Sequence, residues 1–254
     1  MMLTVVILGT GNVAEHLFVA FTQSEKIHVA QVVGRNMDRL KEFANNTLIS
    51  DNFNKIVDAD FYIIAVKDDA IPLVSQYLSD KENIVVHTSG AISMDILKQK
   101  NSGVFYPIQT FTKGKSLDFN SIPICIEAKQ QSGLQMLHKL GSSISNKVYE
   151  ISSPQRRKLH LAAVFANNFV NHLYYVSEKI CAEEDLPFSL LHPLIKETAD
   201  KINYFSPCEA QTGPALRDDI KTMESHLHLL KNKKQTELYT LLSEAIKEEH
   251  EKKL

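Results

Sequence analysis

The sequence has little of what marks secreted or metal-binding proteins. Its 254 residues contain no tryptophan and only three cysteines, Cys125, Cys181 and Cys208. They form no C-x-x-C pair, and any disulfide would leave one of them unpaired, so the pattern favours a reducing compartment, with the cytoplasm as the default. No His or Cys spacing fits a metal site, because His226 and His228 would point about 200° apart on a helix. We therefore expect no bound metal.

The chain also lacks a long hydrophobic run and an excess of charge. No stretch approaches the ~18 apolar residues of a membrane helix. The apolar start at 3–8 is short, has no basic flank and runs into a glycine turn, which predicts a first strand rather than a signal peptide. Lys and Arg number 28 against 30 Asp and Glu, for a formal net charge of −2. Neither a nucleic acid nor a membrane is therefore an expected partner.

What the sequence does contain, up to residue 149, is an alternation of short β-rich runs and helical patterns. This alternation is typical of a parallel sheet covered by helices. Between the first two runs, Val13, Leu17, Phe18 and Phe21 recur at helical spacing, which completes a βαβ unit. The expected strands span residues 4–8, 29–33, 61–66, 84–87, 103–106, 123–126 and 147–149.

After residue 152 the strand-like runs stop and long helical patterns begin. Ser153 suits a helix cap and Pro154 the first helical position. Helices are expected near residues 154–183, 188–203, 214–231 and 234–252. The predicted fold class is therefore α/β: a Rossmann-type, mainly parallel sheet domain in residues 1–152, followed by an all-α C-terminal domain in residues 153–254.

A glycine-rich loop, G-x-G-x-x-A, follows the first strand and opens the first helix. Gly9 suits the tight bend, Gly11 lets the backbone approach a pyrophosphate, and Ala14 allows close packing of helix and strand. The amide groups at the start of the helix would face the phosphates. We predict a nicotinamide dinucleotide here; the alternative is a glycine turn without a ligand. The predicted cofactor-binding residues of the loop are Gly9, Thr10, Gly11, Asn12 and Val13.

The end of the second strand indicates which dinucleotide is preferred. Chains that bind NAD usually place Asp or Glu there to hold the ribose 2′-hydroxyl. This chain has Arg35 and Asn36 instead, and the nearest acid, Asp38, lies beyond the strand. The Arg35 guanidinium is suited to a 2′-phosphate. We predict NADP as the cofactor rather than NAD, with Arg35 and Asn36 in its site; otherwise Arg35 is a solvent-facing arginine.

Residues that follow the next strands should line the nicotinamide end, because ligands of open α/β sheets lie at the carboxyl ends of strands. Val66 and Lys67 follow one strand, and Ser89 and Gly90 follow the next. All four are predicted to bind the cofactor, and Ser89 is also a predicted catalytic residue because it offers a hydroxyl. The alternative for Ser89 and Gly90 is an ordinary turn.

Neighbouring polar residues have structural alternatives. Asp68 or Asp69 is most simply the N-cap of a helix over 70–78. His87 suits a hydrogen-bonded position inside the edge of the sheet. Gln109 lies on the loop after the next strand and is a predicted substrate contact; the alternative is a loop that packs Phe111 on the core.

Two polar clusters stand out in the helical part. At about 100° per residue, His160, Asn167 and Asn171 share one stripe and Asn168 lies beside it, which indicates either a face toward a cleft or hydrogen bonds between helices. In the second cluster, Thr212 or Gly213 would cap a helix that Pro214 begins, giving an anion site to which Arg217 adds a charge. Asn168, Thr212 and Arg217 are predicted substrate contacts; a surface charge cluster of Arg217, Asp218 and Asp219 is the alternative.

These motifs together resemble a known family. They are similar to Rossmann-like proteins with a C-terminal helical domain of unknown function, classed as candidate NADP oxidoreductases and related in architecture to pyrroline-5-carboxylate reductase, ketopantoate reductase and the β-hydroxyacid dehydrogenases. The resemblance covers almost the whole chain, and it favours Asn168 as a catalytic residue. The segments that carry it are Gly9-x-Gly11-x-x-Ala14, Gly34-Arg35-Asn36, His87-Thr88-Ser89-Gly90-Ala91, Tyr106-Pro107-Ile108-Gln109-Thr110-Phe111, Asn167-Asn168-Phe169 and Thr212-Gly213-Pro214.

The chain departs from one relative in a way that matters for mechanism. β-Hydroxyacid dehydrogenases carry a catalytic Lys four residues before an Asn on the first long helix, whereas Val164 and Ala163 occupy the equivalent positions here. The leading hypothesis is an NADP-dependent oxidoreductase that transfers hydride to or from a small carbonyl- or imine-containing acid bound between the domains. The alternative is a non-catalytic module that senses NADP(H). In both, the helical domain is expected to form a homodimer.

Overall fold

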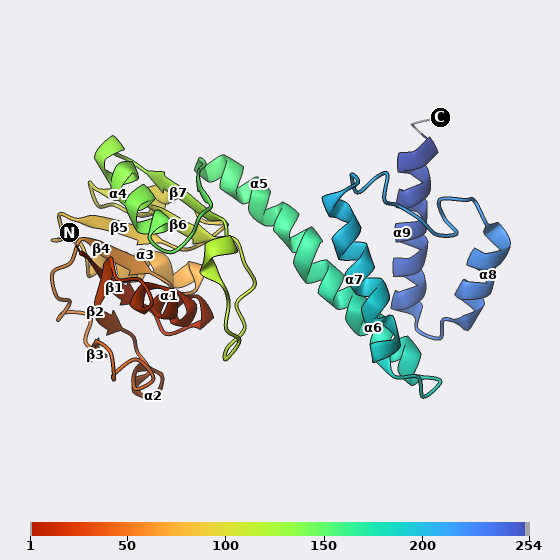
Figure 1. Cartoon of the computed structure of the whole chain (residues 1–254), viewed down its shortest axis with the longest axis horizontal. Helices are drawn as coiled ribbons and strands as arrows, with labels where there is room; N and C mark the ends of the chain where they lie inside the picture. Colours follow the sequence, from red (N-terminus) through yellow and green to blue (C-terminus); the bar gives the residue numbers. More distant parts are fainter. Residues whose placement is uncertain (1, 252–254) are drawn as a thin grey trace. The chain divides into compact units, whose positions relative to one another are not determined.

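The computed structural model describes residues 2–251, in two compact units that divide between Asn168 and Phe169. The first unit contains an eight-stranded sheet with the order β3-β2-β1-β4-β5-β6-β7-β8 (Figure 1). Its strands are β1 Leu3–Leu8, β2 Ile27–Val33, β3 Leu48–Ser50, β4 Phe61–Ile64, β5 Ile84–His87, β6 Ser102–Pro107, β7 Ile124–Ala128 and β8 Val148–Glu150. Its helices are α1 Asn12–Thr22, α2 Met37–Leu40, α3 Ile71–Gln76, α4 Gln131–Ser142 and α5 Ser153–Ala163.

Every neighbouring strand pair is parallel except β6 with β7. From β1 the chain adds β2 and β3 on one side and then β4 and the later strands on the other, so the order reverses between β1 and β4. The carboxyl ends of β1, β4, β5 and β6 consequently lie along one edge, beside this reversal, where Rossmann-type sheets bind dinucleotides. The predicted α/β fold class is confirmed.

The sheet is buried on both faces, which explains why its strands read as continuous apolar runs. Alternate residues of β1 belong to two different core clusters, Val5 and Ile7 to one and Val6 and Leu8 to the other. Helices α1 and α4 contribute to the first cluster and α3 to the second. The sequence did not predict β3, since three residues at the edge of a sheet are too few to give a periodic pattern.

The start of the long helical stretch differs in detail from the prediction. Ser152, not Ser153, is the N-cap. Its side chain accepts from the Gln155 amide, and the Gln155 side-chain oxygen accepts from the Ser152 amide, which makes a capping box. The stretch is not regular, because a π-helical segment at Val164–Phe169 separates α5 from α6, Val170–Ala182. The π turn has more residues per turn, so the expected common stripe of His160, Asn167 and Asn171 does not continue at 100° per residue.

The second unit consists of helices α6, α7 His192–Asp200, α8 Ile220–Leu229 and α9 Lys233–Glu251. The prediction that Pro214 begins a helix is wrong, because α8 begins only at Ile220, with Asp219 as its N-cap. Gly213 and Asp218 both have positive φ, at 115° and 53°, which a right-handed helix does not allow. No helix in residues 2–251 combines the length and the apolar character needed to cross a membrane.

Burial in the second unit is sparse. Among residues 169–250, Ala215 is the only buried residue, and large apolar side chains such as Leu190, Leu194 and Leu241 are exposed. The core clusters of the chain lie in the first unit.

Candidate functional site

The dinucleotide loop has the backbone geometry that a phosphate-binding turn requires. Gly9 adopts a φ of +136°, and a Cβ atom there would lie 2.1 Å from the Ala65 carbonyl oxygen, so only glycine fits between β1 and the end of β4. At Gly11, by contrast, a Cβ would meet no atom within 4 Å. The loop thus packs tightly against the end of β4 at Gly9, whereas Gly11 borders open space.

The start of α1 adds hydrogen-bond donors to this space. Gly11 is the N-cap, and no side chain among residues 2–251 accepts from the first-turn amides. The amides therefore remain available to an anion, where the helix dipole also favours negative charge. The open cradle at Gly11 and these amides together fit the pyrophosphate of a dinucleotide.

Hydrogen bonds from two side chains of α1 hold the loop that follows β6 against this helix. The Asn12 side chain donates to the Phe111 carbonyl oxygen at 2.8 Å. The ring nitrogens of His16 lie 2.8 Å from the Asn12 carbonyl oxygen and 2.9 Å from that of Lys115. The role of His16 could not be predicted from the sequence, because its partner Lys115 is far along the chain and lies in an irregular loop.

The end of β2 carries two arginines. Arg35 and Asn36 are exposed, and the Asn36 side chain caps α2 by accepting from the Arg39 amide at 3.1 Å. The Arg39 guanidinium donates to the Thr10 carbonyl oxygen at 3.3 Å and so reaches the dinucleotide loop. Asp38 is exposed and pairs with Lys41. Arg35 was predicted from the sequence and Arg39 was not. The position of Arg39, four residues after Arg35, could have indicated that it also reaches the dinucleotide loop.

At the end of β4, Val66 is half-buried and Lys67 is exposed. The proposed capping by Asp68 or Asp69 is wrong. Asp68–Ala70 form a 3₁₀ turn, and α3 begins at Ile71 with no side-chain cap. The Ala70 amide donates to the Lys67 carbonyl oxygen, so the turn is closed by the backbone instead.

The segment after β5 is buried and ordered by its own side chains. The Ser89 hydroxyl oxygen accepts from the amides of Ala91 and Ile92, each at 3.1 Å. The Ser89 amide in turn donates to His87 Nδ1 at 3.2 Å. Burial, together with the nearby Arg156, lowers the pKa of His87 to about 4, so its ring is neutral near pH 7. His87 is thus hydrogen-bonded at Nδ1, as expected for a structural histidine, whereas its buried Nε2 has no partner within residues 2–251.

Next to this segment, the Tyr106 hydroxyl lies 3.0 Å from His160 Nδ1. Tyr106 is in β6 and His160 in α5, both in the first unit. A Cβ atom on Gly90 would approach the His160 Nδ1 to 2.6 Å and the Tyr106 Cζ to 2.9 Å. Gly90 therefore provides the room in which this pair lies. The sequence analysis did not predict the pairing.

The predicted substrate contacts are dispersed along the chain. Gln109 is exposed and accepts from the Thr110 amide. Asn168 is exposed at the end of the first unit, within the π-helical segment. Thr212 and Arg217 are exposed in the second unit, and no helix begins at Pro214 to form an anion site for them. Asp218 pairs with Lys247 and Asp219 caps α8, so the charge cluster has separate structural partners.

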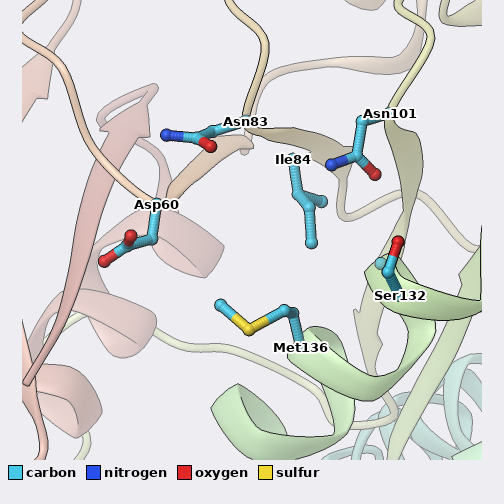
Figure 2. Close-up of a pocket in the computed structure, with 7 residues that line it drawn as sticks. Asp60, Asn83, Ile84, Asn101, Ser132 and Met136 are labelled. Carbon is cyan, nitrogen blue, oxygen red and sulfur yellow. The ribbon is translucent and has the colours of Figure 1, made fainter. Parts of the chain in front are cut away.

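One pocket lies at the amino ends of β4, β5 and β6, away from the dinucleotide loop. Figure 2 shows its side chains, and its volume is about 100 Å³. Pockets for drug-sized ligands measure roughly 300–1,000 Å³, so this one is too small for a dinucleotide. Its lining residues are Asp60, Asn83, Ile84, Asn101, Ser132, Gly133 and Met136.

Two family profiles match the chain. One is described as NADP oxidoreductase coenzyme F420-dependent and matches residues 4–90, which include the dinucleotide loop and Ser89-Gly90. The other is described as a domain of unknown function (DUF2520) and matches residues 122–246. No curated protein sequence matches the chain significantly.

Solved structures match the chain over nearly its full length. A candidate NADP oxidoreductase from Bacteroides fragilis is 36% identical, with 97% of this chain and 98% of that chain covered and a TM-score of 0.90. A protein from Thermotoga maritima is 26% identical, with coverages of 98% and 99% and a TM-score of 0.76. A 1-pyrroline-5-carboxylate reductase from Streptococcus pyogenes shares the fold at 13% identity, with coverages of 97% and 99% and a TM-score of 0.65. The chain therefore belongs to the family of Rossmann-type NADP oxidoreductases that carry this C-terminal domain of unknown function.

Proposed function

We propose that the protein is an NADP-dependent oxidoreductase that transfers hydride to or from a small acid containing a carbonyl or imine group. The observation that carries this proposal is the dinucleotide loop, where Gly9 is the only residue that fits and Gly11 faces open space beside unpaired helix amides. When bound, NADPH supplies the hydride. The chain's own part is to hold the pyrophosphate with residues 9–13 and to orient the acceptor with Ser89 and Asn168.

The preference for NADP rests on the positive charge at the end of β2. Arg35 is exposed there, Arg39 reaches the Thr10 carbonyl oxygen, and Asp38 is engaged by Lys41. A 2′-phosphate is a good partner for such arginines, whereas a 2′-hydroxyl gains little from them. Asn36, Val66, Lys67 and Gly90 complete the proposed cofactor site.

A thermal-shift comparison tests the cofactor. We expect NADPH to raise the melting temperature far more than NADH at equal concentration, since a ligand at about a hundred times its Kd stabilises the folded state by about 2.7 kcal/mol. Arg35→Asp should lower NADPH affinity by roughly 10- to 100-fold, the value of one lost charge-assisted contact, and leave NADH binding intact. Lys55→Asp is the control, because Lys55 is exposed and the substitution makes the same kind of charge change without touching Arg35, Arg39 or the Lys41–Asp38 pair. Equal shifts with both cofactors would contradict the proposal.

Catalysis is tested by following NADPH oxidation with a panel of small 2-oxo acids and small cyclic imino acids. The roles of Gln109, Thr212 and Arg217 as substrate contacts remain predictions, for which Arg217→Ala should raise KM for the acid by roughly 10- to 100-fold without changing NADPH affinity. The second candidate, a non-catalytic sensor of NADP(H), is favoured by Val164 at the position of the dehydrogenase lysine. NADPH binding without turnover of any acceptor would support it.

We also propose that the helical unit forms a homodimer. Large apolar side chains are exposed in it, and Ala215 is the only buried residue between positions 169 and 250, so this part of the chain has no core of its own. Exposed apolar surface of this extent is typical of obligate interfaces between subunits. Light scattering at micromolar concentration should give twice the mass of the 28.7 kDa chain.

A further inference from the structure

The Tyr106–His160 pair is the strongest unassigned feature of the first unit. Two polar side chains that are 54 positions apart make a direct hydrogen bond of 3.0 Å, and their rings lie nearly edge to face, with an interplanar angle of 74°. Both are only partly exposed. Nothing in the function proposed so far uses them.

The position of His160 is fixed by buried contacts one helical turn earlier. Arg156 is fully buried and donates to Glu127 and to the Ile92 carbonyl oxygen. Ser153 also donates its hydroxyl to Glu127 at 2.7 Å. A buried arginine is tolerated only when it is paired, so these bonds dock the start of α5 firmly on the sheet. His160 follows Arg156 by four residues and therefore lies on the same face of the helix.

The pair lies at the edge of the sheet where the nicotinamide is expected. Gly90 follows β5, and a Cβ atom there would collide with both rings. Tyr106 is near the end of β6. The loop that continues from β6 is bound through Phe111 to Asn12 of the dinucleotide loop. The pair and the dinucleotide loop thus belong to the same edge of the sheet, the one formed by the carboxyl ends of its parallel strands.

The two groups have complementary chemistry. Burial raises the pKa of Tyr106, so its hydroxyl keeps its proton near pH 7. If the ring is an imidazolium, its Nδ1–H has a ready acceptor in the neutral Tyr106 hydroxyl oxygen, 3.0 Å away. Within residues 2–251, no hydrogen-bond partner occupies the other ring nitrogen, Nε2. An imidazolium held in this way presents one N–H for donation, which is the arrangement of a general acid.

We propose that His160 is the proton donor of the reductive reaction and that Tyr106 positions it. This inference rests on the proposed function. With a carbonyl acceptor, a hydride with its electron pair forms the new C–H bond, and the C=O π electrons move to oxygen. The His160 Nε2–H bond then breaks, and its proton becomes the hydroxyl proton of the product. The neutral imidazole then takes up one H⁺ from the solvent and is ready for the next turnover. The balance is one carbonyl, one NADPH and one proton converted to one alcohol and NADP⁺.

Enzyme kinetics provide the first test, with the acceptor from the acid panel that the native protein reduces fastest. His160→Asn should lower kcat by roughly 10²- to 10⁴-fold, the usual contribution of a general acid. Tyr106→Phe should lower kcat by about tenfold, because it removes only the positioning bond. NADPH affinity and the KM of the acceptor should stay within about twofold in both variants. His138→Asn, an exposed histidine on α4, is the matched control.

Proton NMR of the native protein provides a second test that needs no turnover. The His160 ring C2–H resonance, assigned by its loss in His160→Asn, should move when NADP⁺ is added. The 2′-phosphate form of ADP-ribose, which lacks the nicotinamide, should not move it, and the His138 resonance should respond to neither. This test applies even if no acceptor in the panel is reduced or if Tyr106→Phe fails to fold, because it needs only the native protein and the resonance assignment.

The outcomes separate this inference from the function on which it rests. If NADP⁺ binds and the His160 resonance does not move, or if His160→Asn keeps kcat within about threefold, the assignment of the donor is wrong while the oxidoreductase proposal stands. If the native protein does not bind NADPH at all, the proposed function itself fails.

Discussion

The two units of the chain differ sharply in how they use apolar residues. In the first unit, apolar residues of the strands and helices build two core clusters, one on each face of the sheet. In the second, helices of ordinary amphipathic sequence bury almost nothing within the chain. A helical pattern predicts that a face will be covered, but it does not say by which chain. The first unit therefore covers its own apolar residues, whereas the second is the part that we propose a partner subunit covers.

The largest expected effect concerns the buried ion pair that docks α5 on the first unit. Arg156→Met should destabilise the protein by about 3–5 kcal/mol, because the mostly buried Glu127 carboxylate would lose its positively charged partner and keep only the neutral donors of Ser153. Arg157→Met is the control, since Arg157 is the exposed neighbour and should change stability by less than about 0.5 kcal/mol. Urea unfolding monitored by circular dichroism measures both. Equal effects would show that α5 does not depend on this pair.

Next, two glycines of one loop should respond in opposite ways. Gly9→Ala should cost about 3 kcal/mol, from the strained φ and the clash with the Ala65 carbonyl oxygen. Gly11→Ala should leave stability within about 0.5 kcal/mol, because its Cβ meets no protein atom. It should nevertheless weaken NADPH binding by at least about tenfold, since the methyl group enters the phosphate cradle. A stable Gly11→Ala variant with native NADPH affinity would place the phosphates elsewhere.

A pH effect should belong to the first unit alone. The pKa of His87 is lowered by burial to about 4 in the folded protein, against 6.5 in an unfolded chain. Between these pH values the unfolded chain binds a proton that the folded one does not, so stability falls as the pH is lowered from 6.5 to 4, by up to about 3 kcal/mol. His87→Gln should reduce this slope. His28→Gln, at an exposed site of β2, should leave it unchanged.

The smallest effect tests the second unit. Leu194 in α7 and Leu48 in β3 are exposed to almost the same extent, 63% and 62%, yet only the first lies in the unit without a core. Leu194→Asp should weaken the homodimer by roughly 10- to 100-fold, whereas Leu48→Asp should not change the mass measured by light scattering. A monomeric native protein, or a dimer that tolerates both substitutions, would show that the second unit is covered in another way.

Much of the sheet could be predicted because parallel strands buried on both faces are continuous apolar runs. The start of α8 could not, since Pro214 suits a first helical turn and the left-handed Asp218 that prevents one has no local sequence signature. The Tyr106–His160 bond could not be predicted either. It depends on the antiparallel β6–β7 pair that brings Glu127 to Arg156 and on the docking of α5 that follows. Patterns along the chain indicate elements, whereas such sites arise from how the elements pack.

The room at Gly90 has a consequence for how this family can vary. Any side chain at position 90 would displace the His160 and Tyr106 rings, so the three positions form one steric unit. In an alignment of relatives, a residue larger than glycine at position 90 should occur only where position 160 or 106 carries a smaller or differently shaped side chain. Covariation among these three columns would then identify the relatives that have kept the pair.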